Sequence, residues 1–308
     1  MKFTDIAGCA GAAAFLLFAS AVAPFFGTFF CLLTPLPFLF YSTKLGFQEG
    51  VKLAAIALAG IALVSKLAGQ PGIIMVAVEF SALGLILSEL FKRRLTVGQT
   101  ILFATVFTIL LTLGYLFMLG LSKGMGPFDM ILDYLEAHLK ATVDIYRKMG
   151  MPQENIVELE KYGNQFIHIA YPSLMIISVG FSVWLNVVMA RPVFRMGRLR
   201  YPDYISLDRW QTPEIMIWGL IVSGFALFLL SGGIKLIAVN VLIVLIVIYL
   251  FHGLSIVLFY FNRYRLPPWV RIGAYFLIIV QQFFLLILAL AGIFDQWVDF
   301  RKLHREAA

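Results

Sequence analysis

One acidic side chain, Glu79, lies in the middle of the apolar stretch between Gly72 and Phe91. If that stretch crosses a membrane, a carboxyl group at its centre is expensive and normally faces the protein interior beside a partner. Two interpretations follow for Glu79. It is either a ligand or proton site, or a protonated carboxyl group that forms a packing hydrogen bond to a neighbouring helix.

A histidine and several amides are the other polar groups deep in apolar sequence. His252 has no second metal ligand three or four residues away, which argues against a metal site and favours a hydrogen-bonded side chain. Amides at this depth usually join helices, but several facing one cavity would recognise a polar ligand. The candidate ligand-lining residues are Glu79, Asn186, Asn240, His252 and Gln281.

Small residues recur four positions apart near the N-terminus. Gly8 is followed by Ala12, and Ala10 by Ala14. This spacing lets a second helix approach closely, either within the chain or on a partner protein. Gly8, Ala10, Ala12 and Ala14 are therefore candidates for a helix-docking face, with packing inside the chain as the alternative.

The segment from 191 to 200 is the most basic part of the chain. It carries Arg191, Arg195, Arg198 and Arg200. Such a segment marks a cytoplasmic loop by the positive-inside rule. It is also a candidate patch for anionic lipid headgroups or for a cytoplasmic partner.

Signatures of catalysis are missing from the sequence. It contains no Walker loop, no G-x-S-x-G, no H-E-x-x-H and no C-x-x-C motif, and Cys9 and Cys31 lack metal-ligand spacing. Asp295 and Asp299, with Arg301 nearby, are interpreted as an interfacial ion-pair cluster and not as a catalytic carboxylate pair. We therefore predict that the protein is not an enzyme and holds no cofactor and no metal.

The elements that must position these residues follow from composition. Hydrophobic residues make up 61% of the 308 residues and charged residues 13%, with a mean hydropathy of +0.91. That much apolar surface requires lipid as the solvent, and a backbone in lipid must be helical or form a closed barrel. The net charge of +7 reflects basic loops beside apolar stretches, so it indicates membrane topology and not nucleic acid.

The sequence predicts an all-α, polytopic membrane bundle with about eight or nine transmembrane helices. Proline and glycine positions delimit them, and the second, with Pro35 and Pro37, is either spanning or re-entrant. The first is expected to be an uncleaved span, although it resembles a signal peptide. The expected spans cover about 6–22, 28–41, 49–68, 72–91, 97–121, 166–189, 214–231, 234–261 and 270–294.

Residues 122–165 are different because they are rich in acids. Apolar residues recur there at helical spacing, which predicts an amphipathic helix over Phe128–Lys148 at the outer surface, ended by Gly150 and Pro152. Alternating the loops places the three basic loops inside. It also places the basic C-terminus outside, so either one weak span is re-entrant or the tail tolerates the outer side.

The order of the motifs along the chain resembles the YybS-like family of bacterial membrane proteins. The resemblance covers essentially the whole chain and includes Pro35-Leu-Pro37, Arg209-Trp-Gln-Thr-Pro213, Tyr249-Leu-Phe-His-Gly253 and the stretch from Gly292 to Arg301. The front half of that family is similar to the S-components of energy-coupling-factor vitamin transporters and to the rod-shape protein MreD. The resemblance implies a six-helix, S-component-like unit over 1–190, which includes the outer amphipathic segment 122–165. Residues 191–308 would add a basic cytoplasmic loop and three further transmembrane helices.

Two functions are consistent with these features. The first is a transport-type bundle that binds a small ligand and has no ATPase of its own. The second is a non-catalytic membrane scaffold that recruits partners, as MreD-like proteins are thought to do. The expected location is the bacterial cytoplasmic (inner) membrane. The expected partners are membrane lipids, another membrane protein and a small-molecule ligand, but not nucleic acid.

Overall fold

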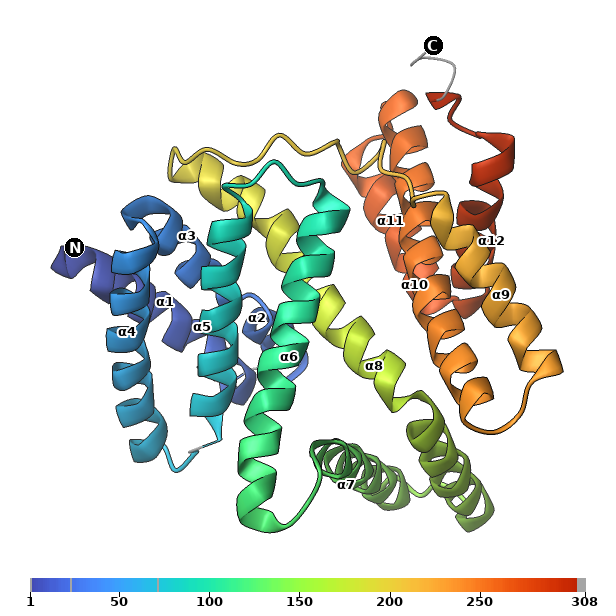
Figure 1. The fold of residues 1–308 in the computed structure, drawn as a ribbon, viewed down its shortest axis with the longest axis horizontal. Coiled ribbons are helices and arrows are strands. Elements are labelled where there is room, and N and C mark those ends of the chain that lie inside the picture. Colours follow the sequence, from blue (N-terminus) through green and yellow to red (C-terminus); the bar gives the residue numbers. More distant parts are fainter. Residues whose placement is uncertain (1, 23, 71, 304–308) are drawn as a thin grey trace. The chain divides into compact units, whose positions relative to one another are not determined.

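Every regular element that the computed structural model describes is a helix, which confirms the predicted all-α class (Figure 1). The structure describes residues 2–22, 24–70 and 72–303. The helices are α1 (Phe3–Val22), α2 (Pro24–Cys31), α3 (Pro35–Leu45), α4 (Phe47–Leu67), α5 (Ile73–Leu90), α6 (Val97–Lys123), α7 (Pro127–Lys148), α8 (Gln153–Met196), α9 (Ile215–Leu229), α10 (Gly232–Arg263), α11 (Pro268–Val280) and α12 (Gln282–Val298).

Several helices are long and apolar enough to cross a membrane. Among the described residues α4, α5, α6, α8 and α10 qualify, and α11 with α12 qualifies as one bent pair. Three shorter apolar helices cover Phe3–Ala19, Phe29–Leu45 and Ile215–Leu229. The protein is therefore a multi-pass helical bundle, while the predicted count of eight or nine spans stays a prediction.

The helices form two compact units. Unit 1 contains Met1–Met130 and Ser178–Tyr204, and unit 2 contains Ile131–Ile177 and Ile205–Ala308. Both units share α8, whose 44 residues would extend about 66 Å, twice the roughly 30 Å of a bilayer core. The expected span over 166–189 thus covers only the apolar part of a longer helix. The acidic residues before it are helical as well.

Unit 1 packs α1, α3, α4 and α5 around small side chains. Cys9 and Ala13 of α1 are buried against Ala57 of α4 and Phe38 of α3. Gly84 lets α5 approach α3 closely, because a Cβ on Gly84 would lie only 2.6 Å from the carbonyl oxygen of Pro35.

The proposed docking residues of α1 divide between two environments. Gly8 faces the ring of Tyr41 on α3, while Ala10 and Ala14 pack against the core of unit 1. Ala12 is exposed. Three of the four small residues therefore contact other side chains of unit 1, and the docking of a partner helix on this face stays a prediction.

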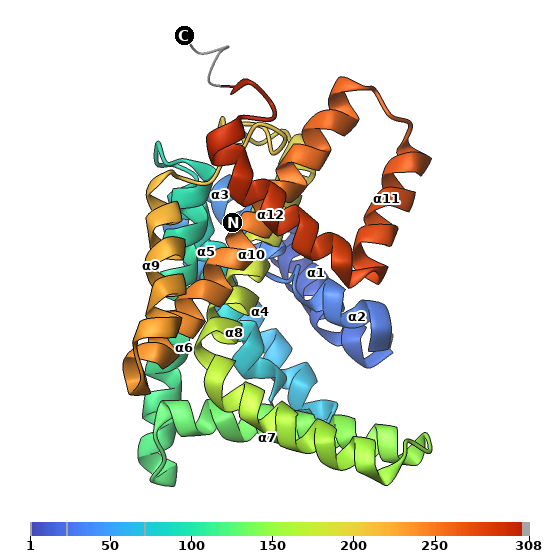
Figure 2. The ribbon, with the colours of Figure 1, turned by 90° about the vertical axis from the view of Figure 1, so that its right-hand side faces the viewer.

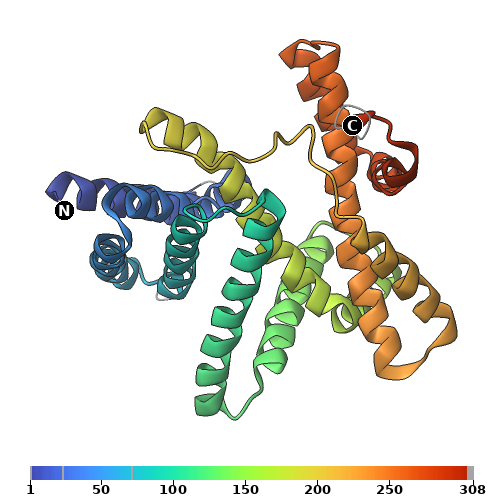
Figure 3. The ribbon, with the colours of Figure 1, turned by 45° about the horizontal axis from the view of Figure 1, so that its top comes forward.

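In unit 2, α9 runs along the first half of α10, and α12 packs on the second half (Figures 1 and 3). Glycines let α10 and α12 approach each other. A Cβ on Gly253 would meet the carbonyl group of Leu288, and one on Gly292 would meet the carbonyl oxygen of Tyr249. The two backbones are thus in direct contact.

The expected ninth span over 270–294 is not continuous. It breaks at Gln281, where α11 and α12 meet at a bend of 102° (Figure 2). Both outer ends of this pair lie at the C-terminal end of α10. Arg271 of α11 donates to the carbonyl oxygen of Phe261, at 3.1 Å, and Tyr260 donates to the carbonyl oxygen of Phe300, at 2.9 Å.

The α11–α12 pair is therefore a hairpin that returns the chain to the end of α10 from which it left. This geometry favours a re-entrant pair over an outer C-terminus, the two alternatives that the charge pattern left open. The tail at 299–303 then shares a side with Arg263 and Arg265.

The amphipathic segment is helical as predicted: α7 covers Pro127–Lys148, against the expected Phe128–Lys148. Within unit 2 it lies along the first part of α8. Gly163 of α8 packs against Leu139, and Nε2 of His168 lies 2.9 Å from a carboxylate oxygen of Glu136. Its position at the outer surface stays a prediction.

Candidate functional site

Glu79 has the polar partner that a carboxyl group within a membrane helix requires. It lies on α5 and is partly buried, and Thr112 of α6 donates a hydrogen bond to its Oε1 atom over 2.7 Å. Thr112 also lies 3.0 Å from the carbonyl oxygen of Thr108, one turn back on α6. The α5–α6 contact thus carries an acid beside hydroxyl groups.

Further polar side chains are buried on α6 and on the second half of α8. Asn186 donates from Nδ2 to the carbonyl oxygens of Leu32 and Ser182, both at 2.8 Å. The two helices touch near Gly180 of α8, where a Cβ would lie 3.8 Å from the side chain of Thr105 on α6, an ordinary van der Waals distance. We call Glu79, Thr105, Thr108, Thr112, Ser182 and Asn186 the polar track of unit 1.

Four atoms of this polar track have no hydrogen-bond partner among the described residues. They are the hydroxyl oxygens of Thr105, Thr108 and Ser182, and Oδ1 of Asn186. Each of these residues is at most 7% exposed. A buried polar atom without a partner costs about 1–3 kcal/mol, so such atoms normally face water or a ligand. The track can therefore offer acceptors, hydroxyl donors and one acid to a small polar molecule.

Asn240 has a structural task in unit 2. Pro172 lacks an N–H group and lies inside α8, where proline disrupts the hydrogen bonds of the helix. The amide of Asn240 lies in that gap: Oδ1 accepts from the backbone N–H of Ser173 at 2.9 Å, and Nδ2 donates to the carbonyl oxygen of Ile169 at 2.8 Å. A side chain of α10 thus replaces a backbone bond of α8.

His252 is part of a buried charged cluster that the sequence did not predict. Its Nε2 atom lies 3.0 Å from Oδ2 of Asp295 and 2.9 Å from a terminal nitrogen of Arg301. Arg301 and Asp295 form an ion pair at 2.9 Å, and neither side chain is exposed. The expected Asp295–Arg301 pair is therefore confirmed, but it lies inside the protein and not at an exposed helix end.

The charges of this cluster are satisfied by its own members and by loop carbonyls. Arg301 donates to the carbonyl oxygens of Asp208 and Trp210 and to the hydroxyl of Ser255. The second carboxylate oxygen of Asp295 accepts the backbone N–H of Phe300. Ser255 itself donates to the carbonyl oxygen of Trp210, not to the histidine. The cluster therefore joins α10, α12 and the 205–214 loop without forming a nucleophile–base pair.

Some hydrogen-bonding atoms in and around this cluster have no partner in the part of the chain that the structure describes. Among the described residues, the atoms without a partner are the hydroxyls of Tyr249 and Thr212, Nδ1 of His252, Oε1 of Gln296 and Nε of Arg301. The ring of Tyr249 stacks on that of His252. Buried polar atoms of this kind are commonly satisfied by ordered water, and none of the five atoms is exposed.

The remaining sequence candidates are exposed. Gln281 lies at the α11–α12 break and is open to the surroundings. All four arginines of the 191–200 patch are exposed as well, while Phe194 between them is fully buried against Phe91 and Tyr201. An aromatic anchor thus holds this basic patch in place, and its role toward lipid or a partner stays a prediction.

Sequence reasoning missed the three threonines of α6 and the His252–Asp295–Arg301 contact. Thr105, Thr108 and Thr112 recur at three- and four-residue spacing, so they share one face of the helix. That spacing was a usable signal. The charged cluster had a weaker signal, namely the acid Asp295, three residues after Gly292 at the end of an apolar run.

Buried polar groups inside a multi-pass helical bundle are thus the main feature of this protein. A family model described as a predicted membrane protein, DUF2232, matches residues 11–296. The chain belongs to this family. Both the polar track and the charged cluster up to Asp295 fall inside the matched DUF2232 region. No curated protein and no solved structure matches the chain.

Proposed function

We propose that this protein binds a small polar ligand in unit 1, along the polar track, as a transport-type membrane protein without its own ATPase. The observation that supports this is the set of four buried polar atoms on α6 and α8 that have no partner among the described residues. Because every unsatisfied polar group in an apolar interior is costly, a ligand that hydrogen-bonds to them gains affinity.

Glu79 specifies the ligand further. Among the described residues its carboxyl group accepts one hydrogen bond, from Thr112, so it can still pair with a donor or cationic group of a ligand. The hydroxyls of Thr108 and Thr105, one and two turns away from Thr112 along α6, would bind the neutral part of the ligand. The resemblance of the front half to S-components supports the same class, in which a separate protein supplies the energy. It also supports a location in the bacterial cytoplasmic membrane.

Native mass spectrometry of the protein purified in mild detergent tests this proposal. The wild type should carry an additional small-molecule mass. The double substitution Thr105→Val and Thr108→Val keeps the side-chain shape and removes two hydroxyls that have no partner in the structure. It should therefore leave folding intact and abolish the additional mass.

The matched control is Thr142→Val on α7, an exposed threonine whose hydroxyl donates to the carbonyl oxygen of His138. It should retain the bound molecule. A wild-type spectrum without any small molecule, or the same mass in the double variant, would contradict the proposal. Co-purification of a second protein with an empty track would favour the scaffold function.

A further inference from the structure

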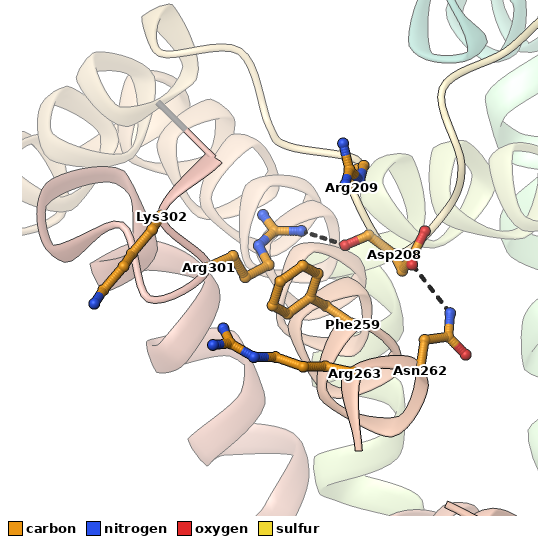
Figure 4. Close-up of a pocket in the computed structure, with 7 residues that line it drawn as sticks. All are labelled: Asp208, Arg209, Phe259, Asn262, Arg263, Arg301 and Lys302. Atoms are coloured by element: carbon orange, nitrogen blue, oxygen red, sulfur yellow. Dashed lines mark hydrogen bonds between the residues drawn. The ribbon is translucent and has the colours of Figure 1, made fainter. Parts of the chain in front are cut away.

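A pocket opens at the C-terminal end of α10, away from the polar track and outside the proposed function. Its cavity volume is about 340 Å³, at the lower end of the roughly 300–1,000 Å³ of ligand pockets. The 205–214 loop, the end of α10 and the tail after α12 supply its walls (Figure 4). The residues that line it are Asp208, Arg209, Phe259, Asn262, Arg263, Arg301 and Lys302.

Positive charge exceeds negative charge in this pocket. Four of the seven residues are cationic, and Asp208 is the one acid. Asp208 is engaged already, because Nδ2 of Asn262 donates to its carboxylate over 3.0 Å. Burial alone would raise the pKa of Asp208, but hydrogen bonds from Ser206 and Asn262 outweigh burial and hold that pKa below its ordinary value. The acid thus stays ionised and cannot be the counter-ion of all four cations.

Arg263 and Lys302 are the cations available to a ligand. Both are exposed, and within the part of the chain that the structure describes neither side chain has a hydrogen bond or ion pair. Arg301 is only 1% exposed, and its charge is balanced by Asp295, while its Nε atom has no partner. Figure 4 shows Arg301 and Arg263 on either side of the Phe259 ring.

The tail that carries two of these cations is held in a fixed shape. Asp299 and Lys302 both adopt left-handed backbone conformations, with φ of 46° and 56°. Such conformations in residues other than glycine cost of order 1–3 kcal/mol and persist only where surrounding contacts impose them. Here the contacts are the buried Arg301 and the hydrogen bond from Tyr260 to Phe300. The pocket is therefore a built feature of the fold and not a chance arrangement of a free end.

The pocket lies where anionic lipid would be met. It is at the end of the membrane helix α10, next to the basic turn with Arg263 and Arg265, which the positive-inside rule assigns to the cytoplasmic side. The cytoplasmic leaflet is rich in anionic phospholipid, and basic pockets between helices at this level bind lipid phosphate groups. Phe259 supplies an apolar wall beside the cations.

From these observations we propose that the pocket binds the phosphate group of an anionic phospholipid, held by Arg263 and Lys302. The acyl chains would lie in the bilayer beside α10.

The test measures phosphatidylglycerol binding to the full-length protein in mild detergent by native mass spectrometry. The variant is the double substitution Arg263→Gln and Lys302→Gln, which breaks no hydrogen bond of the structure. Its affinity for phosphatidylglycerol should fall about 30-fold, since each basic residue near an anionic surface contributes roughly five-fold. Zwitterionic phosphatidylcholine should bind the wild type more weakly, and the double substitution should change that binding little.

The matched control is Arg93→Gln with Arg94→Gln, two exposed cations of unit 1 that change the net charge equally. It should leave the affinity within about two-fold, because bound lipid responds to charges inside a pocket more than to distant ones. Equal weakening in both variants, or none in the first, would overturn the proposal. Binding of inorganic phosphate without lipid, lost in the first variant, would keep the phosphate chemistry but reject lipid as its source.

Discussion

The two units bury their ionisable groups differently, although each also contains buried polar atoms without a partner among the described residues. In unit 2 the side chains of His252, Asp295 and Arg301 contact one another, two loop carbonyls and the hydroxyl of Ser255 at 2.7–3.1 Å. In unit 1, among the described residues, Glu79 in the middle of α5 accepts one hydrogen bond, and the neighbouring hydroxyls of Thr105 and Thr108 have no partner. A closed network rigidifies a fold, whereas an open one is available to a ligand.

The difference also concerns what each set of residues joins. Asn240 and Arg301 of unit 2 bond mainly to backbone atoms of other elements, so they replace missing main-chain partners. In the polar track of unit 1, Asn186 also bonds to a backbone carbonyl, that of Leu32, but the hydroxyls of Thr105, Thr108 and Ser182 have no partner among the described residues. Substitutions should therefore destabilise unit 2 and leave unit 1 folded, and four predictions examine this contrast.

The largest effect should come from Asp295→Asn. This change keeps the side-chain size and leaves Arg301 buried without a counter-charge, which typically costs 3–5 kcal/mol. Denaturant unfolding in detergent should show a loss of about that size. Asp299→Asn is the control, because asparagine tolerates the left-handed conformation of this residue. Equal stabilities of the two variants would contradict the closed network.

Gly253→Ala should come next. The added Cβ would meet the carbonyl group of Leu288, and overpacking of this kind costs about 1–3 kcal/mol or more. Gly273→Ala on α11 has open space around its Cβ, so it should be neutral or stabilising by up to about 1 kcal/mol. If both variants melted at the same temperature, α10 and α12 could not be in backbone contact.

Asn240→Leu removes the amide that bridges Ser173 and Ile169, and we expect a loss of about 1–2 kcal/mol. Pro172→Ala restores a backbone N–H to α8, so the same leucine substitution should cost less in that background. A double-mutant cycle measures this coupling. Additive costs would mean that Asn240 does not compensate for the proline.

The smallest effect should be that of Thr108→Val in unit 1. Its hydroxyl oxygen has no partner among the described residues, so its removal should change the stability of the ligand-free protein by less than about 1 kcal/mol. Ser255→Ala in unit 2 removes an acceptor of Arg301 and should cost about 1–3 kcal/mol. Thermal unfolding of the two variants, compared with the wild type, gives the ranking, and the reverse order would contradict the contrast.

Much of the fold could be predicted from local signals. The periodicity of apolar residues placed α7 within one residue of its observed start, and Gly150 with Pro152 marked its end. Hydropathy found the apolar part of α8 but not its acidic first turns, because a polar stretch continues a helix without any apolar signal. The break at Gln281 was missed although two adjacent glutamines lie there.

The candidate site was less accessible to sequence reasoning. Glu79 stood out because it is one acid in an apolar run, and the structure gives it the partner Thr112, 33 residues away. His252 was recognised as hydrogen-bonded, but Asp295 and Arg301 lie 43 and 49 residues further on. Which helices pack together depends on contacts such as Gly253 with Leu288, and spacing within one helix carries no record of them.

The most direct test of the open and closed networks is one experiment on two carboxyl groups. Glu79→Gln and Asp295→Asn are the same chemical change, one in each unit, and each variant is purified in mild detergent for native mass spectrometry and thermal unfolding. We expect Glu79→Gln to lose the bound small molecule and to unfold at the temperature of the ligand-free wild type, and Asp295→Asn to unfold at a much lower temperature. Equal losses of stability in the two variants, or a bound molecule that persists in Glu79→Gln, would contradict the assignment of unit 1 as the ligand site.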